Sequence, residues 1–180
     1  MDRKFYKKCL KTEIFDKYFE SKKHCNIFDK IWLLFLSPES NCIYLIRKKE
    51  LFESRGKLFR LRSRFIHRKL ILKYGIHITE GTTIGIGLRI AHPVGIVITK
   101  CKIGDYFTIY QNCTIGQKKP NTGLCPTIGN HVTMFASSSI IGKVNVASNV
   151  VIGAGSLVLQ DIDKPGIYVG SPARFIKKID

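Results

Sequence analysis

An aliphatic residue returns at nearly every sixth position between residues 78 and 158. This period fits neither an amphipathic helix nor an alternating strand. It predicts a left-handed parallel β-helix of hexapeptide repeats, in which three short strands and three turns close one triangular coil. One coil cannot bury its own apolar face, so about four to five coils must stack. The predicted stack positions are Ile78, Ile84, Ile90, Ile96, Ile103, Ile109, Ile115, Ile128, Met134, Ile140, Val146, Ile152 and Val158.

The register of this repeat is interrupted at two places. Seven residues separate Ile96 from Ile103, and thirteen separate Ile115 from Ile128. The second interval contains residues 117–123, a polar stretch with Pro and Gly that predicts a projecting loop. We expect the β-helix to occupy residues 76–159 and a C-terminal loop and tail to occupy residues 160–180.

A different pattern precedes the repeat, because apolar residues between 1 and 75 recur at helical spacing among lysines and arginines. This part is predicted to be a small basic α-helical region. Pro38 is expected at the first turn of a helix. The predicted helices cover residues 3–20, 27–36, 42–53 and 56–74.

Charge is concentrated in this helical region. The chain has 180 residues and a net charge of +17, of which residues 1–75 carry +12, from 20 Lys and Arg against 8 Asp and Glu. No nucleic-acid-binding motif accompanies the charge, so nucleic acid is not an expected partner. A basic amphipathic helix at 56–74 is suited to peripheral contact with an anionic membrane surface. The alternative is that this helix packs on the open end of the β-helix.

Several other classes of protein are disfavoured by composition. No window reaches the ~18 apolar residues of a membrane span, and no signal-like apolar core follows the first residues. The expected location is cytoplasmic, at the inner face of the membrane if the basic helices bind it. Six cysteines without a CxxC pair are expected to be reduced. The β-helix holds only His77, His92 and His131, without the spacing of a zinc site, so no metal is expected.

One histidine stands out as a chemical group. His92 lies two positions past Ile90, which predicts that its side chain projects outward from the coil. A neutral imidazole in such a place can accept the proton of an incoming hydroxyl. The alternative is an exposed histidine in a turn without a catalytic role.

Four segments stand out by their order and spacing, residues 92–98 (HPVGIVI), 109–116 (IYQNCTIG), 152–156 (IGAGS) and 170–174 (GSPAR). Through these segments, residues 75–176 resemble the catalytic domain of the serine acetyltransferase family of hexapeptide acyltransferases, which includes polysaccharide O-acetyltransferases. The resemblance implies that His92 is the general base, which activates an acceptor hydroxyl to attack the thioester of acetyl-CoA.

The same resemblance implies a binding edge for acetyl-CoA and an assembly. Gly116 is expected to border the thioester and to offer a backbone N–H to an oxyanion. Basic groups at the end of the chain are expected to meet the CoA phosphates. The family also implies a homotrimer with active sites between subunits. The remaining implied CoA-binding residues are Ala136, Ala154, Leu159 and Gln160 along the edge, with Arg174 and Lys177 at the phosphates.

Two positions depart from the family pattern. His77 stands where an acidic residue usually orients the base, and Cys125 stands where serine acetyltransferases carry a second histidine. These departures favour a different acceptor. We therefore expect an acetyl-CoA-dependent O-acetyltransferase that acts on a sugar hydroxyl in surface polysaccharide biosynthesis. The alternative is a serine O-acetyltransferase with a shortened N-terminal part.

Overall fold

The computed structural model describes residues 1–16, 26–119 and 125–179. The chain divides into two compact units, Met1–Gly75 and Ile76–Asp180. Each unit is described by itself. The loop predicted at residues 117–123 lies partly outside the described residues.

The first unit is helical, and its central helix is α4, which packs against α1, α3 and α5. Helix α4 begins at Pro38, so this proline lies in the first turn as expected, although the predicted range of 42–53 begins four residues later. The Ser37 side chain caps the helix by accepting the backbone N–H of Ser40. The predicted first helix changes to a π-helix after Leu10. The elements are α1 (Arg3–Leu10), η1 (Lys11–Asp16), α3 (Ile27–Phe35), α4 (Pro38–Glu53) and α5 (Lys57–Tyr74).

A buried ion cluster joins α4 to η1 inside this unit. The Arg47 side chain is fully buried, and its Nε donates to Glu13 Oε2 at 2.9 Å. Its Nη1 donates to Glu50 Oε2 at 2.9 Å. Each of the three charges would be costly to bury alone. The cluster therefore fixes η1 on α4 through pairing that no apolar pattern predicts.

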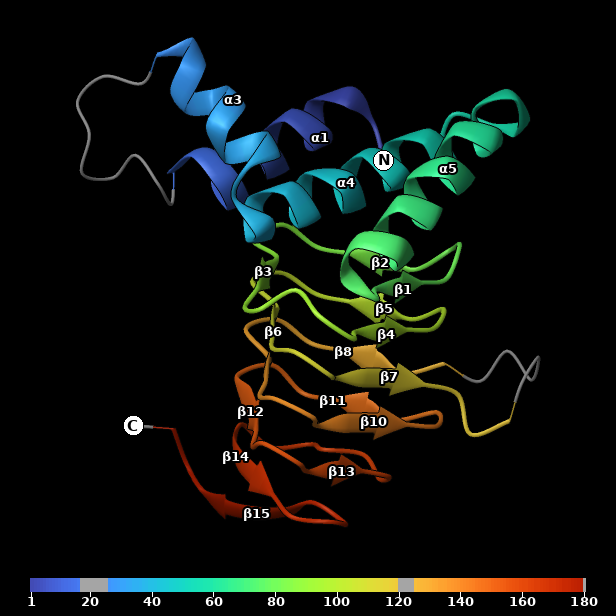
Figure 1. Ribbon diagram of the computed structural model, residues 1–180. Coiled ribbons are helices and arrows are strands. Elements are labelled where there is room, and N and C mark those ends of the chain that lie inside the picture. Colours follow the sequence, from blue (N-terminus) through green and yellow to red (C-terminus); the bar gives the residue numbers. More distant parts are fainter. Residues whose placement is uncertain (17–25, 120–124, 180) are drawn as a thin grey trace. The chain divides into compact units, whose positions relative to one another are not determined.

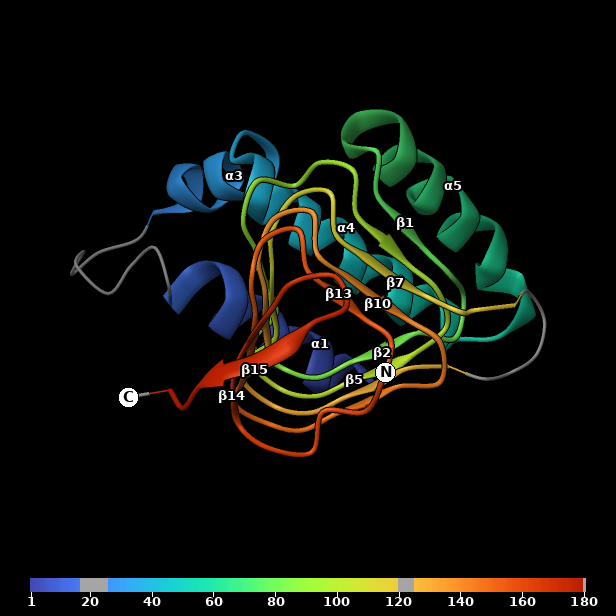
Figure 2. The same ribbon diagram turned by 90° about the horizontal axis from the view of Figure 1, so that it is seen from below.

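The second unit confirms the predicted left-handed parallel β-helix, with about five coils. Its short strands stack into three sheets (Figure 1), and Figure 2 looks along the stack. Sheet A contains β1 (His77–Ile78), β4 (Val97–Ile98), β7 (Thr114–Gly116), β10 (Ser139–Ile141) and β13 (Leu157–Val158). Sheet B contains β2 (Thr83–Ile84), β5 (Lys102–Ile103), β8 (Thr127–Ile128) and β11 (Asn145–Val146). Sheet C contains β3 (Arg89–Ile90), β6 (Thr108–Ile109), β9 (Thr133–Met134), β12 (Val150–Ile152), β14 (Gly166–Val169) and β15 (Arg174–Lys177).

The stack position predicted for Ile96 belongs instead to Ile98. Ile98 pairs with Ile78 in the preceding coil and with Ile115 in the next. Residues two apart on a strand face the same side, and both isoleucines are buried, so the pattern could not choose between them. Eight positions therefore lead from Ile90 to Ile98, against six from Ile109 to Ile115. The two additional residues lie in the corner that contains His92.

At another corner, glycines make room for hydrogen bonds between coils. A Cβ on Gly85 would lie 2.2 Å from Asp105 Oδ1, which accepts the backbone N–H of Ile86 at 2.9 Å. A Cβ on Gly104 would lie 2.3 Å from Asn130 Oδ1, which accepts the N–H of Asp105 at 2.8 Å. The small residues that recur after the stack positions thus serve contacts with the next coil as well as the turn.

Residues beyond the last hexapeptide still take part in the sheets. Strand β14 pairs in parallel with β12, and β15 pairs antiparallel with β14. Ile162 forms a parallel bridge with Val146.

None of the helices in the described ranges combines the length and apolar character needed to cross a bilayer.

Candidate active site

His92 lies on the lengthened corner that follows β3, and its side chain is exposed as predicted from its position. Its φ of 55° is in the left-handed region, which histidine adopts more readily than most residues. The imidazole is tilted by 57° against the Tyr110 ring, with centroids 6.4 Å apart. Tyr110 in turn stacks on Phe135 at 4.9 Å. No hydrogen bond joins the imidazole to another residue in the described part of the chain, so it is open to an incoming proton donor.

Two of the predicted residues at this corner, in coils further along the stack, have small side chains. Strands β6, β9 and β12 are paired in succession, so the positions two past each of their stack residues form one column. Ala136 and Ala154 occupy that column in the third and fourth coils. The Ala136 carbonyl accepts the N–H of Gly155 at 2.9 Å. These two predicted residues therefore share one edge with His92, where small side chains leave the backbone accessible.

Gln111 occupies the same column in the second coil, next to Ala136. In the first coil its place is taken by Val94, whose carbonyl accepts the N–H of Asn112 at 2.9 Å, as the Gln111 carbonyl accepts that of Ser137 at 3.0 Å. The Gln111 Oε1 is buried and has no hydrogen-bond partner among the described residues. A buried acceptor left unpaired costs about 1–3 kcal/mol, so such atoms call for a functional explanation. Gln111 was not among the predicted site residues, although it lies two positions after Ile109, just as His92 lies two positions after Ile90.

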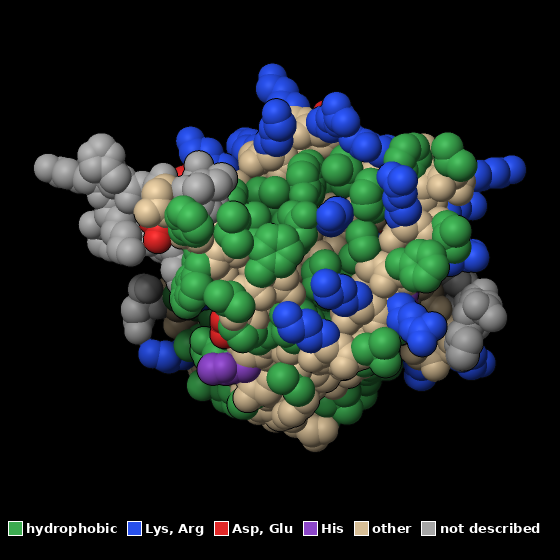
Figure 3. Space-filling model, turned by 45° about the horizontal axis from the view of Figure 1, so that its top comes forward, with side chains coloured by type: hydrophobic (Ala, Val, Ile, Leu, Met, Phe, Trp, Pro, Cys, Tyr) green, Lys and Arg blue, Asp and Glu red, His purple; other side chains and the backbone are tan. Residues whose placement is uncertain are grey.

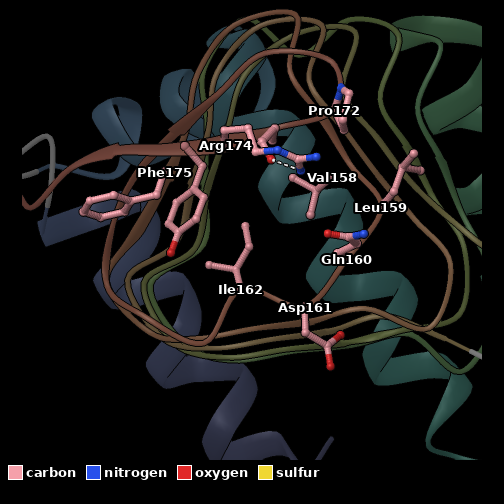
Figure 4. A pocket seen from close by; sticks show the side chains of 10 residues that line it. Val158, Leu159, Gln160, Asp161, Ile162, Pro172, Arg174 and Phe175 are labelled. Atoms are coloured by element: carbon pink, nitrogen blue, oxygen red, sulfur yellow. Dashed lines mark hydrogen bonds between the residues drawn. The ribbon is translucent and has the colours of Figure 1, made fainter.

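A second group of predicted residues lies at the C-terminal end of the β-helix. Leu159, Gln160 and Arg174 line a hollow of about 290 Å³ together with the apolar side chains of Ile162 and Phe175 (Figure 4). The Arg174 Nη1 donates to the Ala173 carbonyl at 3.3 Å. Five steps between paired strands lead from β3, which precedes His92, to β15, which carries Arg174, or about 24 Å at the usual strand spacing.

Gly116 and Lys177 are not members of either group. Gly116 ends β7, the third strand of sheet A, and its carbonyl accepts the N–H of Gly142 at 2.8 Å. A Cβ there would lie 3.3 Å from Ile141 Cδ1. Lys177 is exposed in β15, opposite Ile167, and is not among the residues that line the hollow.

The two positions that depart from the family pattern have other surroundings. His77 is exposed in β1, and its backbone N–H donates to the Ile96 carbonyl at 2.9 Å. Cys125 is half-buried, and its Sγ accepts from Gln117 Nε2 at 3.1 Å. Burial, together with the nearby Cys125 thiol, raises the pKa of Cys101 to about 12. Where the family pattern has a second histidine, this chain thus has the thiol of Cys125, and the thiol of Cys101 lies near it.

Metal ligands do not gather in the parts of the chain that the structure describes: no group of three His, Cys, Asp or Glu side chains lies together there. His131 instead stacks on Tyr106, with ring centroids 4.8 Å apart.

The fold and the corner that follows β3 describe a hexapeptide-repeat β-helix protein with an exposed histidine on a lengthened turn. No known family model matches the chain. The serine acetyltransferase of Synechococcus elongatus is 39% identical over 104 residues, which cover 57% of this chain and 43% of that protein. The serine acetyltransferase of Staphylococcus epidermidis is 42% identical over 106 residues, which cover 58% and 50%. The chain thus spans about half the length of these relatives.

Solved structures agree with this likeness at the level of the fold. The serine acetyltransferase of Neisseria gonorrhoeae in complex with serine has a TM-score of 0.80 at 24% identity, over 97% of this chain and 70% of that one. A serine acetyltransferase in complex with CoA has a TM-score of 0.76 at 20% identity, over 97% and 71%. The chain is thus similar to serine acetyltransferases in sequence over more than half of its length, and it shares their fold.

These comparisons correct the prediction of a polysaccharide acetyltransferase. The relatives and structural neighbours are serine acetyltransferases, which favours the alternative reading. The prediction was wrong because it gave too much weight to His77 and Cys125. Two changed side chains do not outweigh about 40% identity over more than half of the chain.

Proposed function

We propose that this protein transfers the acetyl group of acetyl-CoA to the hydroxyl of L-serine. The observation that carries the proposal is the identity of about 40% to serine acetyltransferases over some 105 residues. That length matches the β-helical unit, which has the exposed imidazole of His92 on its edge. The products are O-acetyl-L-serine and CoA.

The reaction needs one group that accepts and then returns a proton. His92 takes the proton of the serine hydroxyl as its oxygen forms a bond to the carbonyl carbon of the thioester. The bond from this carbon to sulfur then breaks, and the leaving sulfur receives the proton from the imidazolium. The ring of Tyr110 limits the orientations of the imidazole. This arrangement needs no carboxylate at the position of His77.

Acetyl-CoA supplies the activated thioester, and a long, thin co-substrate suits the edge below His92. Ala136 and Ala154 would let its arm lie against the backbone. Leu159 and Gln160 would continue this edge toward the C-terminal hollow. The phosphates would meet Arg174, which lines the hollow, and Lys177, which is exposed nearby on β15. Gly116 would offer its backbone N–H to the carbonyl oxygen.

Gln111 gives the site a means of recognising an amino acid. Its buried Oε1 lies one coil from His92 and would accept an N–H of the serine ammonium group. A hydrogen bond to a charged donor contributes about 1.5–3 kcal/mol, so Gln111→Leu, with similar volume and no acceptor, should raise KM for serine by about 10- to 100-fold. The kcat should change little. An unchanged KM for serine with a raised KM for acetyl-CoA would show that Gln111 binds the other substrate.

A second copy of the chain is expected to complete the site, because the exposed imidazole of a single chain is not shielded from water. We propose a homotrimer in which a neighbour covers the corner of His92. Sedimentation equilibrium should give three times the chain mass of 20.5 kDa. A fully active monomer would contradict this part of the proposal.

The identity of the acceptor is tested by product analysis. Purified full-length protein is incubated with acetyl-CoA and, in separate reactions, L-serine, L-threonine, free sugars and polysaccharide oligomers. Mass spectrometry should detect O-acetyl-L-serine, and CoA release should be fastest with L-serine. Acetylation of a sugar at a higher kcat/KM than serine would refute serine as the substrate.

A further inference from the structure

Helix α5 presents an apolar stripe to solvent. Leu58, Leu61, Phe65 and Leu72 are 86%, 61%, 63% and 74% exposed. Their spacing of three, four and seven residues keeps them on one face, since a helix turns once every 3.6 residues. Only Ser63, Leu70 and Tyr74 are buried on this helix. The stripe is therefore separate from the face that packs on α4.

Cations flank the stripe on both sides. Arg64 and Arg68 lie along one side of it, Arg62 and Lys69 lie along the other, and all four are exposed. Helix α5 has seven Lys and Arg and no Asp or Glu. Figure 3 shows hydrophobic side chains gathered on the face of the molecule turned toward the viewer, with Lys and Arg among and around them. Arg68, Lys69 and Lys73 also line a shallow hollow of about 340 Å³ with Phe65 and Leu72.

The cations and the apolar stripe of α5 together favour one class of binding partner over two others. A second copy of the chain would bring one row of cations against another, which is unfavourable at short range. Nucleic acid would pair with the cations but would leave Leu58, Leu61 and Phe65 in water. An anionic lipid surface does both, because its headgroups neutralise the cations while its acyl region receives the stripe.

We propose that α5 docks this protein on membranes that contain anionic lipid, with the Leu58–Leu72 stripe inserted and the flanking cations at the headgroups. The helix lies in the plane of the interface and does not cross the bilayer. Helix α3 adds a second exposed apolar face in the same unit, through Phe28, Trp32 and Phe35. This proposal is independent of the acetyl transfer reaction.

The test is co-sedimentation of the full-length protein with vesicles of phosphatidylcholine that contain about 30 mol% phosphatidylserine. The protein should bind these vesicles, should bind pure phosphatidylcholine at least tenfold more weakly, and should be released by high salt. Leu61→Ser/Phe65→Ser should weaken binding by at least tenfold. Its control, Ile176→Ser/Ile179→Ser, alters two exposed apolar residues of the other unit and should bind normally.

A second pair of variants tests the charges. Each cation near an anionic surface contributes about fivefold, so Arg64→Gln/Lys69→Gln should bind about 25-fold more weakly. Lys102→Gln/Lys143→Gln removes the same charge from exposed positions of the β-helix and should bind like the natural protein. Circular dichroism and the urea midpoint confirm that each variant is folded.

Three outcomes would overturn the proposal. The first is that the natural protein does not bind anionic vesicles. The second is that the control pairs weaken vesicle binding as much as the stripe and cation pairs do. The third is a stripe variant with a reduced assembly mass in sedimentation velocity and unaltered vesicle binding, which would assign the stripe to an interface between copies.

Discussion

The two units of this protein bury polar groups in opposite ways. Among the described residues, all the buried charged side chains belong to the helical unit, namely Glu13, Arg47, Lys49 and Glu50. In the described part of the β-helix, the buried polar side-chain groups are uncharged, namely the hydroxyls of Thr82, Ser138 and Ser156 and the amide oxygen of Gln111. The stability of the helical unit thus depends on a few specific ion pairs, whereas the stability of the β-helix depends on the stacking of aliphatic side chains, which is repeated from coil to coil.

The largest stability effect is expected at the ion cluster of the helical unit. Arg47→Ala would leave Glu13 and Glu50 buried without their cation. Breaking such a buried pair costs about 3–5 kcal/mol. Urea unfolding should show this loss, while Lys4→Ala at an exposed position of α1 should stay within about 0.5 kcal/mol of the natural protein. Equal stability of Arg47→Ala would show that the cluster does not hold η1 on α4.

A comparable change in the β-helix should cost slightly less. Ile140 is fully buried and is stacked between Ile115 and Val158. Ile140→Ala removes its contacts with both neighbouring coils and should cost about 2–5 kcal/mol. The control Lys143→Ala, on the exposed surface two residues after β10, should have little effect. A cost below about 1 kcal/mol would mean that the stack does not carry the stability of this unit.

The repeat explains why the β-helix could be predicted while the helical core could not. A period of six specifies which side chain points inward, so Ile109, Met134 and Ile152 could be placed before the structure. Helix α4 is buried around most of its circumference. Arg47 and Lys49 on such a helix resemble residues of a solvated face. Arg47 pairs with Glu13 of η1, and Lys49 pairs with Glu53 on the same helix, and only the structure shows that both cations are buried.

The same distinction applies to the candidate site. The position of His92 and the column of Ala136 and Ala154 follow from the repeat and could be predicted. The two additional residues of the corner could not, because Ile96 and Ile98 fit the apolar pattern equally well. The buried Oε1 of Gln111 could not be predicted either, because its isolation depends on how neighbouring coils pack.

The smallest expected effect concerns pH and Cys101. Burial, with the thiol of Cys125 nearby, raises the pKa of Cys101 from its ordinary 9.0 to about 12. The unfolded chain therefore releases this proton at a lower pH than the folded chain, so stability is fully present below pH 9 and falls above it. Between about pH 8 and pH 10 the loss is about 1.4 kcal/mol. Cys101→Ala should show a pH dependence shallower by that amount, and identical slopes would contradict the assignment.

The central claim is that the exposed imidazole of His92 drives acetyl transfer to L-serine. Its most direct test is the rate of CoA release from acetyl-CoA with L-serine, measured for the natural protein and for His92→Ala. The account predicts serine-dependent release that falls by about 10²- to 10⁴-fold in the variant, while calorimetry shows unchanged CoA binding. Release by His92→Ala at the natural rate would contradict the claim.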